Sequence, residues 1–192
     1  ENGAFHQTTG PRLGSSRDSE LDGTHSAAAD ADAGDDGVTF GTIQVGQLDN
    51  TVTVNVQNAP SGAKIDAWID FNQDGNWGGA KEEIASSVAV INGSNTIQFH
   101  VPANSESGET FARFRISTAG GLGIGGAAAD GEVEDYVLTV ASPRATPGVF
   151  QIRETNLTGS VDEIWFMGTG DMDGDGDVDL VGTNGYGSNS GL

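Results

Sequence analysis

Apolar and polar residues alternate through the middle of the chain with the period of two that is typical of half-buried β-strands. The alternating runs are 52–56, 65–71, 84–91, 95–101, 111–117 and 134–140. Turn dipeptides such as Asn-Gly, Ser-Gly and Gly-Gly separate the runs, and no stretch has the period of an amphipathic helix. The pattern therefore predicts an all-β chain folded as an antiparallel β-sandwich.

The rest of the chain divides by composition. Residues 1–37 are rich in Gly, Ala, Ser and Asp, which predicts an acidic loop segment that packs on the sandwich of residues 38–141. Residues 142–148 have the Pro, Gly and Ser content of a linker. Beyond it, residues 149–192 predict a short second β unit resembling one propeller blade. Its expected strands are 149–153, 163–167 and 178–182. Because one blade cannot bury its own apolar face, either further blades accompany it or it packs on the sandwich.

Charge narrows the classes of partner. The chain has 28 acidic and 8 basic residues and a net charge of -20, which disfavours nucleic acids and anionic membranes and favours cations. Cysteine is absent, no apolar run reaches the roughly 20 residues of a membrane span, and residues 1–9 lack the features of a signal peptide. A solvated acidic surface is the competing explanation of the charge, so the spacing of the acids has to decide.

The densest acidic spacing lies near the end of the chain, where five Asp residues occupy alternate positions of residues 171–179. Ca²⁺ takes six to eight oxygen ligands from such loops. The expected side-chain ligands are Asp171, Asp173, Asp175 and Asp179, with the backbone carbonyl of Asp177. A solvated acidic turn is the alternative.

A second candidate calcium loop follows the strand at 65–71. Oxygen-bearing residues at its first, third and fifth positions and a Gly at its sixth match the first half of an EF-hand-type loop, here placed between strands. Either of two Glu residues would close the coordination shell. The candidate ligands are Asp70, Asn72, Asp74, Asn76, Glu82 and Glu83. A hairpin loop without metal is the alternative.

The third acidic motif is Asp130-Gly-Glu-Val-Glu-Asp-Tyr136. Strand alternation points Glu132, Glu134 and Tyr136 one way and Asp135 the other. An inward carboxylate requires a partner, so we expect Asp135 to pair with Arg113 or Arg115. Alternatively, Asp130 or Glu132 joins Asp70 and Asp74 at a shared calcium ion; we count Asp130 and Glu132 among the candidate ligands.

This heptad and the strand after it resemble the signature of the GEVED domain. Segments 35–40, 67–75 and 111–115 are also similar to that family, and the resemblance covers about residues 3–141. It implies a β-sandwich module of large secreted bacterial proteins. Residues 171–179 with Leu180-Val181-Gly182 resemble the calcium loop of an FG-GAP repeat of integrin-like propellers, over about residues 149–192.

Enzyme motifs are not found. Residues 121–126 match a dinucleotide fingerprint, but no helix follows, so a glycine loop is favoured. His6, His25 and His100 have no zinc-ligand spacing, and no Ser lies in a nucleophile elbow. Glu82 with Glu132 would be a glycosidase pair only in principle, because calcium explains both better. We therefore predict that the protein is not an enzyme.

Two functions remain. The first is a calcium-stabilised extracellular structural or adhesion module of a bacterial surface or filament-forming protein, with neighbouring domains or copies of itself as partners. The alternative is a carbohydrate-binding module of a secreted enzyme, in which Trp68 and Trp77 stack on extracellular glycans. Both place the protein outside the cell or at its surface, without membrane insertion.

Overall fold

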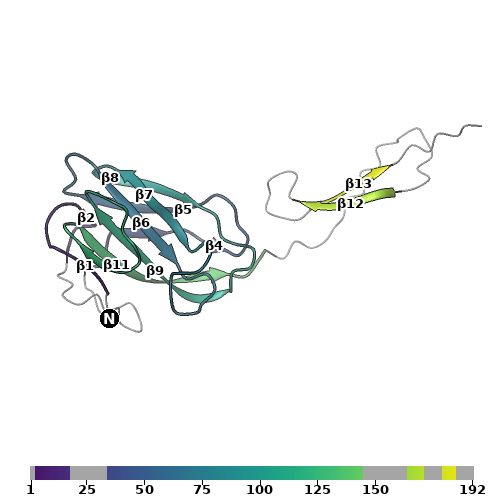
Figure 1. Ribbon diagram of the computed structural model, residues 1–192, viewed down its shortest axis with the longest axis horizontal. Helices are drawn as coiled ribbons and strands as arrows, with labels where there is room; N and C mark the ends of the chain where they lie inside the picture. The colour runs from purple at the N-terminus through teal and green to yellow at the C-terminus, as the bar shows by residue number, and fades with distance from the viewer. Residues whose placement is uncertain (1–2, 18–33, 145–163, 171–178, 185–192) are drawn as a thin grey trace, which may run out of the picture. The chain divides into compact units, whose positions relative to one another are not determined.

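The computed structural model describes residues 3–17, 34–144, 164–170 and 179–184, and these ranges contain strands and turns without a helix. The chain divides into two compact units, 1–144 and 145–192, and the division falls within residues 142–148. No helix of the described residues has the length and apolar character needed to cross a membrane. The predicted all-β class is confirmed (Figure 1).

The larger sheet of the first unit has the strand order β4-β11-β9-β6-β7. Neighbouring strands are antiparallel except β11 and β4, which are parallel. Long strands form its centre and one edge, while β4 has two residues. Their bounds are β4 (Ile43–Gln44), β11 (Glu132–Ala141), β9 (Gly108–Ser117), β6 (Ala63–Ile69) and β7 (Glu83–Val90).

The smaller sheet is built around β5 (Asn50–Gln57). On one side β5 pairs with β8 (Gly93–Phe99), and on the other side with β3 (Val38–Phe40) and β2 (Arg12–Leu13), all antiparallel. A separate parallel pair joins β1 (Ala4–His6) to β10 (Gly126–Ala128). The two larger sheets give the sandwich-like arrangement that the alternation predicted.

The hydrophobic core lies between these sheets and uses the alternating positions. Val52, Val54 and Val56 of β5 are at most 1% exposed, and Ile65, Ala67 and Ile69 of β6 are fully buried. Three aromatic rings pack edge to face with centroids 5.6 to 6.2 Å apart: Phe114 inside the core, and the half-buried Phe40 and Tyr136 against it. Burial of these apolar surfaces is the main favourable contribution to folding.

Residues 1–37, which were expected to form only a loop segment, include two short strands. Residues 3–17, here called the leading segment, contribute β1 and β2, and the Leu13 side chain is fully buried in the core. Such short strands carry no period-two pattern, so their pairing depends on distant parts of the chain.

The second unit contains an antiparallel hairpin of β12 (Ile164–Gly170) and β13 (Asp179–Asn184). These correspond to two of the three strands expected there. The third, at 149–153, lies outside the described residues.

Candidate functional site

The motif at residues 130–136, here called the signature, opens β11, and its register against β9 fixes where each side chain points. Glu132 lies opposite Ile116 and Glu134 opposite Phe114, so both carboxylates face the core with the apolar side chains. They are 5% and 1% exposed. The predicted alternation is correct, but the expectation that Asp135 is the inward acid is wrong: Glu132 and Glu134 face inward, and the backbone amides of Leu13, Asp36 and Gly37 donate to them.

Glu132 holds the leading segment. Its Oε2 accepts a hydrogen bond of 2.8 Å from the backbone N–H of Leu13. Burial raises the pKa of Glu132 to about 7, the Leu13 amide and Arg17 oppose this rise, and Asp35 and Asp36 add to it. The carboxylate is therefore a structural acceptor at the junction of β2 and β11.

Glu134 and Tyr136 hold the chain before β3 in the same way. Glu134 Oε1 accepts hydrogen bonds from the backbone N–H groups of Asp36 (3.1 Å) and Gly37 (3.2 Å). The Tyr136 hydroxyl donates to Glu134 Oε2 at 2.8 Å and accepts from Val38 N at 3.0 Å. Burial raises the pKa of Glu134 to about 8 despite the Tyr136 hydrogen bond, and burial and the Glu134 charge raise the pKa of Tyr136.

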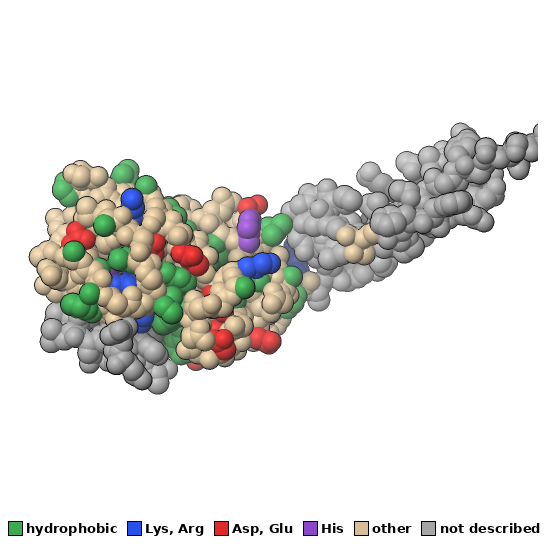
Figure 2. Space-filling view, viewed as in Figure 1, with side chains coloured by type: hydrophobic (Ala, Val, Ile, Leu, Met, Phe, Trp, Pro, Cys, Tyr) green, Lys and Arg blue, Asp and Glu red, His purple; other side chains and the backbone are tan. Residues whose placement is uncertain are grey.

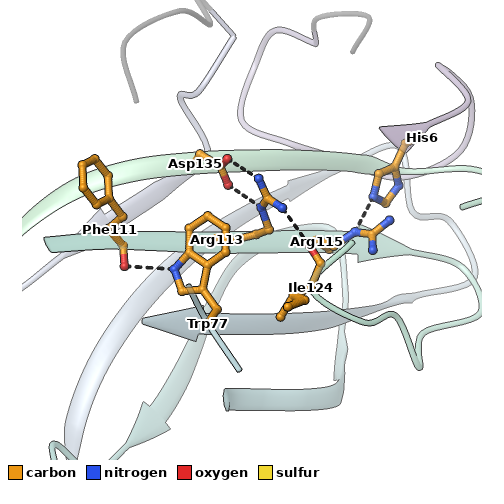
Figure 3. A network of polar contacts seen from close by, with 7 residues as sticks. All are labelled: His6, Trp77, Phe111, Arg113, Arg115, Ile124 and Asp135. Atoms are coloured by element: carbon orange, nitrogen blue, oxygen red, sulfur yellow. Dashed lines mark hydrogen bonds and ion pairs between the residues drawn. The ribbon is translucent and has the colours of Figure 1, made fainter. Parts of the chain in front are cut away.

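Asp135 lies on the opposite face of β11 and binds Arg113, as the sequence predicted (Figure 3). The contact is bidentate, with Arg113 Nε 2.7 Å from Asp135 Oδ1 and Nη2 2.6 Å from Oδ2. The guanidinium lies 4.4 Å from the centroid of the Trp77 ring, and Nη1 donates to the carbonyl of Ile124. The pair is thus enclosed on several sides, in the geometry that makes such contacts strong.

Arg115 holds the glycine-rich loop 120–126 against the same face of the sheet. Its Nη1 and Nη2 donate to three backbone carbonyls of the loop, those of Gly123, Gly125 and Gly126, at 2.6 to 2.8 Å. Its Nε donates to His6 Nε2 at 3.0 Å (Figure 3). The glycine loop expected in place of a dinucleotide fingerprint is confirmed, since its carbonyls surround a buried guanidinium and no helix follows.

His6 and Asp130 complete this junction. His6 Nδ1 donates to the Asp130 carbonyl at 2.8 Å, and because Nε2 accepts from Arg115 the ring is neutral. Burial, together with the nearby charge of Arg115, lowers the pKa of His6 to about 4 although the Asp130 carbonyl opposes this. The Asp130 carboxylate accepts from Thr118 N (3.0 Å) and from the Thr118 hydroxyl (2.5 Å).

Gly131 of the signature has no substitute. Its φ is +97°, and a Cβ there would lie 1.8 Å from the Ile116 carbonyl oxygen. Both the conformation and the close approach of β9 therefore require glycine.

The other acidic site, residues 70–82 and here called the acidic loop, connects β6 to β7. Its first three ligand candidates fold the loop on itself: Asp70 Oδ2 accepts from Gly75 N at 3.0 Å, and Asn72 Oδ1 accepts from Asp74 N at 2.9 Å. Asp74 Oδ1 in turn accepts from Asn76 N at 3.0 Å. Gly75 has a φ of +81° with open space around it.

Glu82 ends the acidic loop, and only one of its two carboxylate oxygens makes a hydrogen bond. It is 1% exposed; its Oε2 accepts from Gly79 N at 2.7 Å, while its Oε1 is buried without a hydrogen-bond partner. Burial raises the pKa of Glu82, the amides of Gly79 and Asn72 oppose the rise, and the charges of Asp70 and Asp74 add to it. A buried carboxylate oxygen without a donor is costly unless a cation or proton joins it.

The structure does not bring all the predicted metal ligands together. Asp70 N bonds to the Phe111 carbonyl, whereas Glu132 lies opposite Ile116, about 16 Å further along β9 at about 3.3 Å per residue. A calcium ion shared by Asp130 or Glu132 with the acidic loop is therefore wrong. Among the described residues no three His, Cys, Asp or Glu side chains are gathered as a metal site, so a cation in the acidic loop would also need amide and backbone oxygens.

The remaining candidates are placed less centrally. Glu83 is exposed at the start of β7. Asp171, Asp173, Asp175 and Asp177 lie outside the described residues, and Asp179 begins β13.

Neither Trp candidate offers an open ring to a sugar. Trp68 is on the outer face of β6, as its phase predicted, but it is only 5% exposed. Trp77 is half-buried beneath the Arg113 guanidinium, and its Nε1 donates to the Phe111 carbonyl at 3.2 Å.

Sequence reasoning missed the partners of the signature in the leading segment. His6 and the amides of Leu13, Asp36 and Gly37 are more than 90 residues from the side chains that bind them. Every residue except proline carries a backbone amide, so residue types could not identify these donors. The one sequence signal was the glycine at position 37, where a Cβ would clash with Leu13.

The first unit is thus an all-β sandwich whose signature ties its leading segment to its sheet. Residues 64–139 match the family model described as the GEVED domain, which confirms that resemblance over this range. The FG-GAP repeat expected after it is not supported by the family comparison. No curated protein and no solved structure matches the chain.

Proposed function

We propose that the first unit is a calcium-stabilised structural module of an extracellular bacterial surface assembly, and that its calcium ion binds in the acidic loop. The observation that carries the proposal is Glu82 Oε1, a buried carboxylate oxygen that makes no hydrogen bond, near the Asn72 amide and close to the charges of Asp70 and Asp74. Ca²⁺ accepts carboxylate, amide and carbonyl oxygens in flexible geometry, and the loop supplies these.

The proposed ligands are oxygens of Asp70, Asn72, Asp74 and Glu82, with further oxygens from the loop backbone or water. In the described loop the side chains of Asp70, Asn72 and Asp74 bond to loop amides, and its three acids are not gathered at one point, so ion binding requires Asp70, Asp74 and Glu82 to move together around the cation. Such an ion would neutralise part of the net charge of -20 and stabilise the β6 to β7 connection. The acidic run 171–179 remains a second, separate calcium proposal, on its sequence alone.

A structural role is favoured over carbohydrate binding because Trp68 is buried and Trp77 packs against Arg113. The charged side chains of β9 and β11 bind other segments of the module: Glu132 and Glu134 accept from backbone amides, and Arg115 donates to the glycine-rich loop. We propose an extracellular location because residues 64–139 match a family that the sequence analysis associates with secreted bacterial proteins, and because the chain is acidic and lacks cysteine.

The test is a calcium titration of the full chain followed by the NMR signal of the Trp77 indole N–H, which reports on the acidic loop and not on residues 171–179. We expect the signal to shift to saturation in the wild type and in the Glu83→Gln control, and to shift only at much higher calcium in Glu82→Gln. An indole signal that ignores calcium in the wild type, or equal titrations of the two variants, contradicts the proposal.

A further inference from the structure

The two margins of the sandwich differ in how their edge strands are protected. At one margin the edges are short: β4 has two residues, and β3 and β2 have three and two. At the other margin the edges are β7 and β8, with eight and seven residues, and within the described residues each pairs with one neighbour only. Long edges expose unpaired backbone N–H and C=O groups to other chains.

Of these two long edges, β7 is protected and β8 is not. Glu83 adds a charge to β7, its register against β6 shifts twice, and Ser87 within it has a φ of +51°. By contrast, β8 pairs with β5 residue by residue from Gly93 to Phe99 and contains no charge, proline or bulge. Natural proteins normally use at least one of these devices to prevent edge pairing.

The distribution of charge along the chain also indicates that the β8 edge is unprotected. Residues 84–105, which include β7 after Glu83, the following turn and all of β8, contain no Asp, Glu, Lys or Arg, the longest such run in a chain of net charge -20. In Figure 2 the upper margin of the first unit, where Figure 1 labels β8, shows mostly hydrophobic and other uncharged atoms, with a basic side chain close by. Ile91, in the turn before β8, is 69% exposed.

From these observations we propose that β8 is an assembly edge at which a second copy of this chain adds its own β8, antiparallel and across a two-fold axis. A second copy is the occupant because its approach elsewhere meets like charge, whereas β8 against β8 brings two uncharged edges together. Pairing centred on Thr96, the middle residue of β8, uses all seven residues of each strand.

Symmetric pairing makes a specific demand on position 96. Each Thr96 side chain, exposed on the outer face of the sheet, lies directly opposite its counterpart. Like charges directly opposite each other in adjacent strands are destabilising, and opposite charges are stabilising. The inference deepens the proposed structural role, on which it rests, by naming the surface and the partner.

The experiment measures molar mass against concentration by sedimentation for the full chain, with excess calcium and with chelator. The variants are Thr96→Lys, Thr96→Glu and the control Thr53→Lys, whose residue is the cross-strand neighbour of Thr96 on the interior strand β5. Circular dichroism checks that each variant is folded. We expect the wild type and Thr53→Lys to dimerise, and each Thr96 variant to do so at least about tenfold more weakly.

The decisive sample is an equimolar mixture of Thr96→Lys and Thr96→Glu, which we expect to dimerise more strongly than either variant alone. A wild type that stays monomeric over the whole concentration range overturns the proposal, as does a mixture no stronger than its components. Dimerisation without any effect of calcium on the Trp77 signal would instead overturn only the proposed calcium site.

Discussion

The acidic loop and the signature are both dense in carboxylates, yet they use them differently. In the signature, Glu132, Glu134 and Asp135 each accept hydrogen bonds from partners far away in sequence, in the leading segment, before β3 or on β9. In the acidic loop the acceptors and donors lie within a few residues of each other, and Glu82 Oε1 has no donor. Acid density alone therefore does not identify a cation site; the decisive feature is whether the protein satisfies the oxygens itself.

The largest effect expected from this contrast concerns two glycines of positive φ. Gly131→Ala places a Cβ 1.8 Å from the Ile116 carbonyl, so we expect a loss of more than about 4 kcal/mol in the free energy of unfolding, or no folding. Gly75→Ala in the acidic loop meets no atom within 4 Å and should cost about 1 kcal/mol. Urea unfolding with chelator compares them, and equal losses would contradict the contrast.

The second effect concerns two aspartates. Asp135→Ala leaves the Arg113 guanidinium, which is 6% exposed, without its bidentate partner, and we expect a loss of about 3 to 4 kcal/mol. Asp74→Ala removes an exposed carboxylate that caps only its own loop, and without calcium it should cost about 1 kcal/mol or less. Urea unfolding measures both. A similar cost for the two variants would mean that the signature is no more integrated into the fold than the loop.

The pH dependence of stability should also follow the signature. Because burial raises the pKa of Glu134 to about 8, the stability it contributes is fully present below its ordinary pKa of 4.5 and is lost as the pH rises through about 8. From pH 6 to pH 9 we expect a loss of about 3 kcal/mol in the wild type. Glu134→Gln should flatten this slope, whereas Glu83→Gln, an exposed residue beside the loop, should not; denaturant unfolding at several pH values checks this.

Below pH 6 the stability should change with pH in the opposite direction, because of His6. His6 is neutral in the fold with its pKa lowered to about 4, so its contribution is present above its ordinary pKa of 6.5 and is lost as the pH falls through about 4. We therefore expect maximal stability on the acid side of pH 7, and a His6→Gln variant, whose side chain is uncharged throughout, should retain more stability than the wild type as the pH falls from 6 to 4. A wild type that is most stable at pH 8 would contradict both assignments.

Much of the fold was predictable because alternation reports burial directly. The strands from β5 to β11, apart from β10, follow the apolar positions of the sequence, and the pairing of Asp135 with Arg113 followed from the cost of an unpaired carboxylate. The short strands β1, β2, β4 and β10 were missed because two or three residues carry no period and pair only through distant contacts.

The orientation of the signature failed for a related physical reason. Alternation separates two faces but does not say which one is buried, and from the sequence we assigned Asp135 to the inward face and Glu132 and Glu134 to the other. The amides of Leu13, Asp36 and Gly37 solvate them inside the fold, and no residue type announces a backbone amide. In the acidic loop, the sequence spacing predicted the ligand candidates, but not that Glu82 rather than Glu83 is buried.

The most direct test of the central claim is the thermal unfolding of the first unit within the full chain, with calcium and with chelator, for the wild type, Glu82→Gln and Glu132→Gln. At calcium about 100-fold above the dissociation constant, we predict a gain of about 2.7 kcal/mol, or about 10 °C, for the wild type. Glu132→Gln should start from lower stability but keep that gain, and Glu82→Gln should lose it. The opposite pattern, with the calcium response lost in Glu132→Gln and kept in Glu82→Gln, would contradict the account.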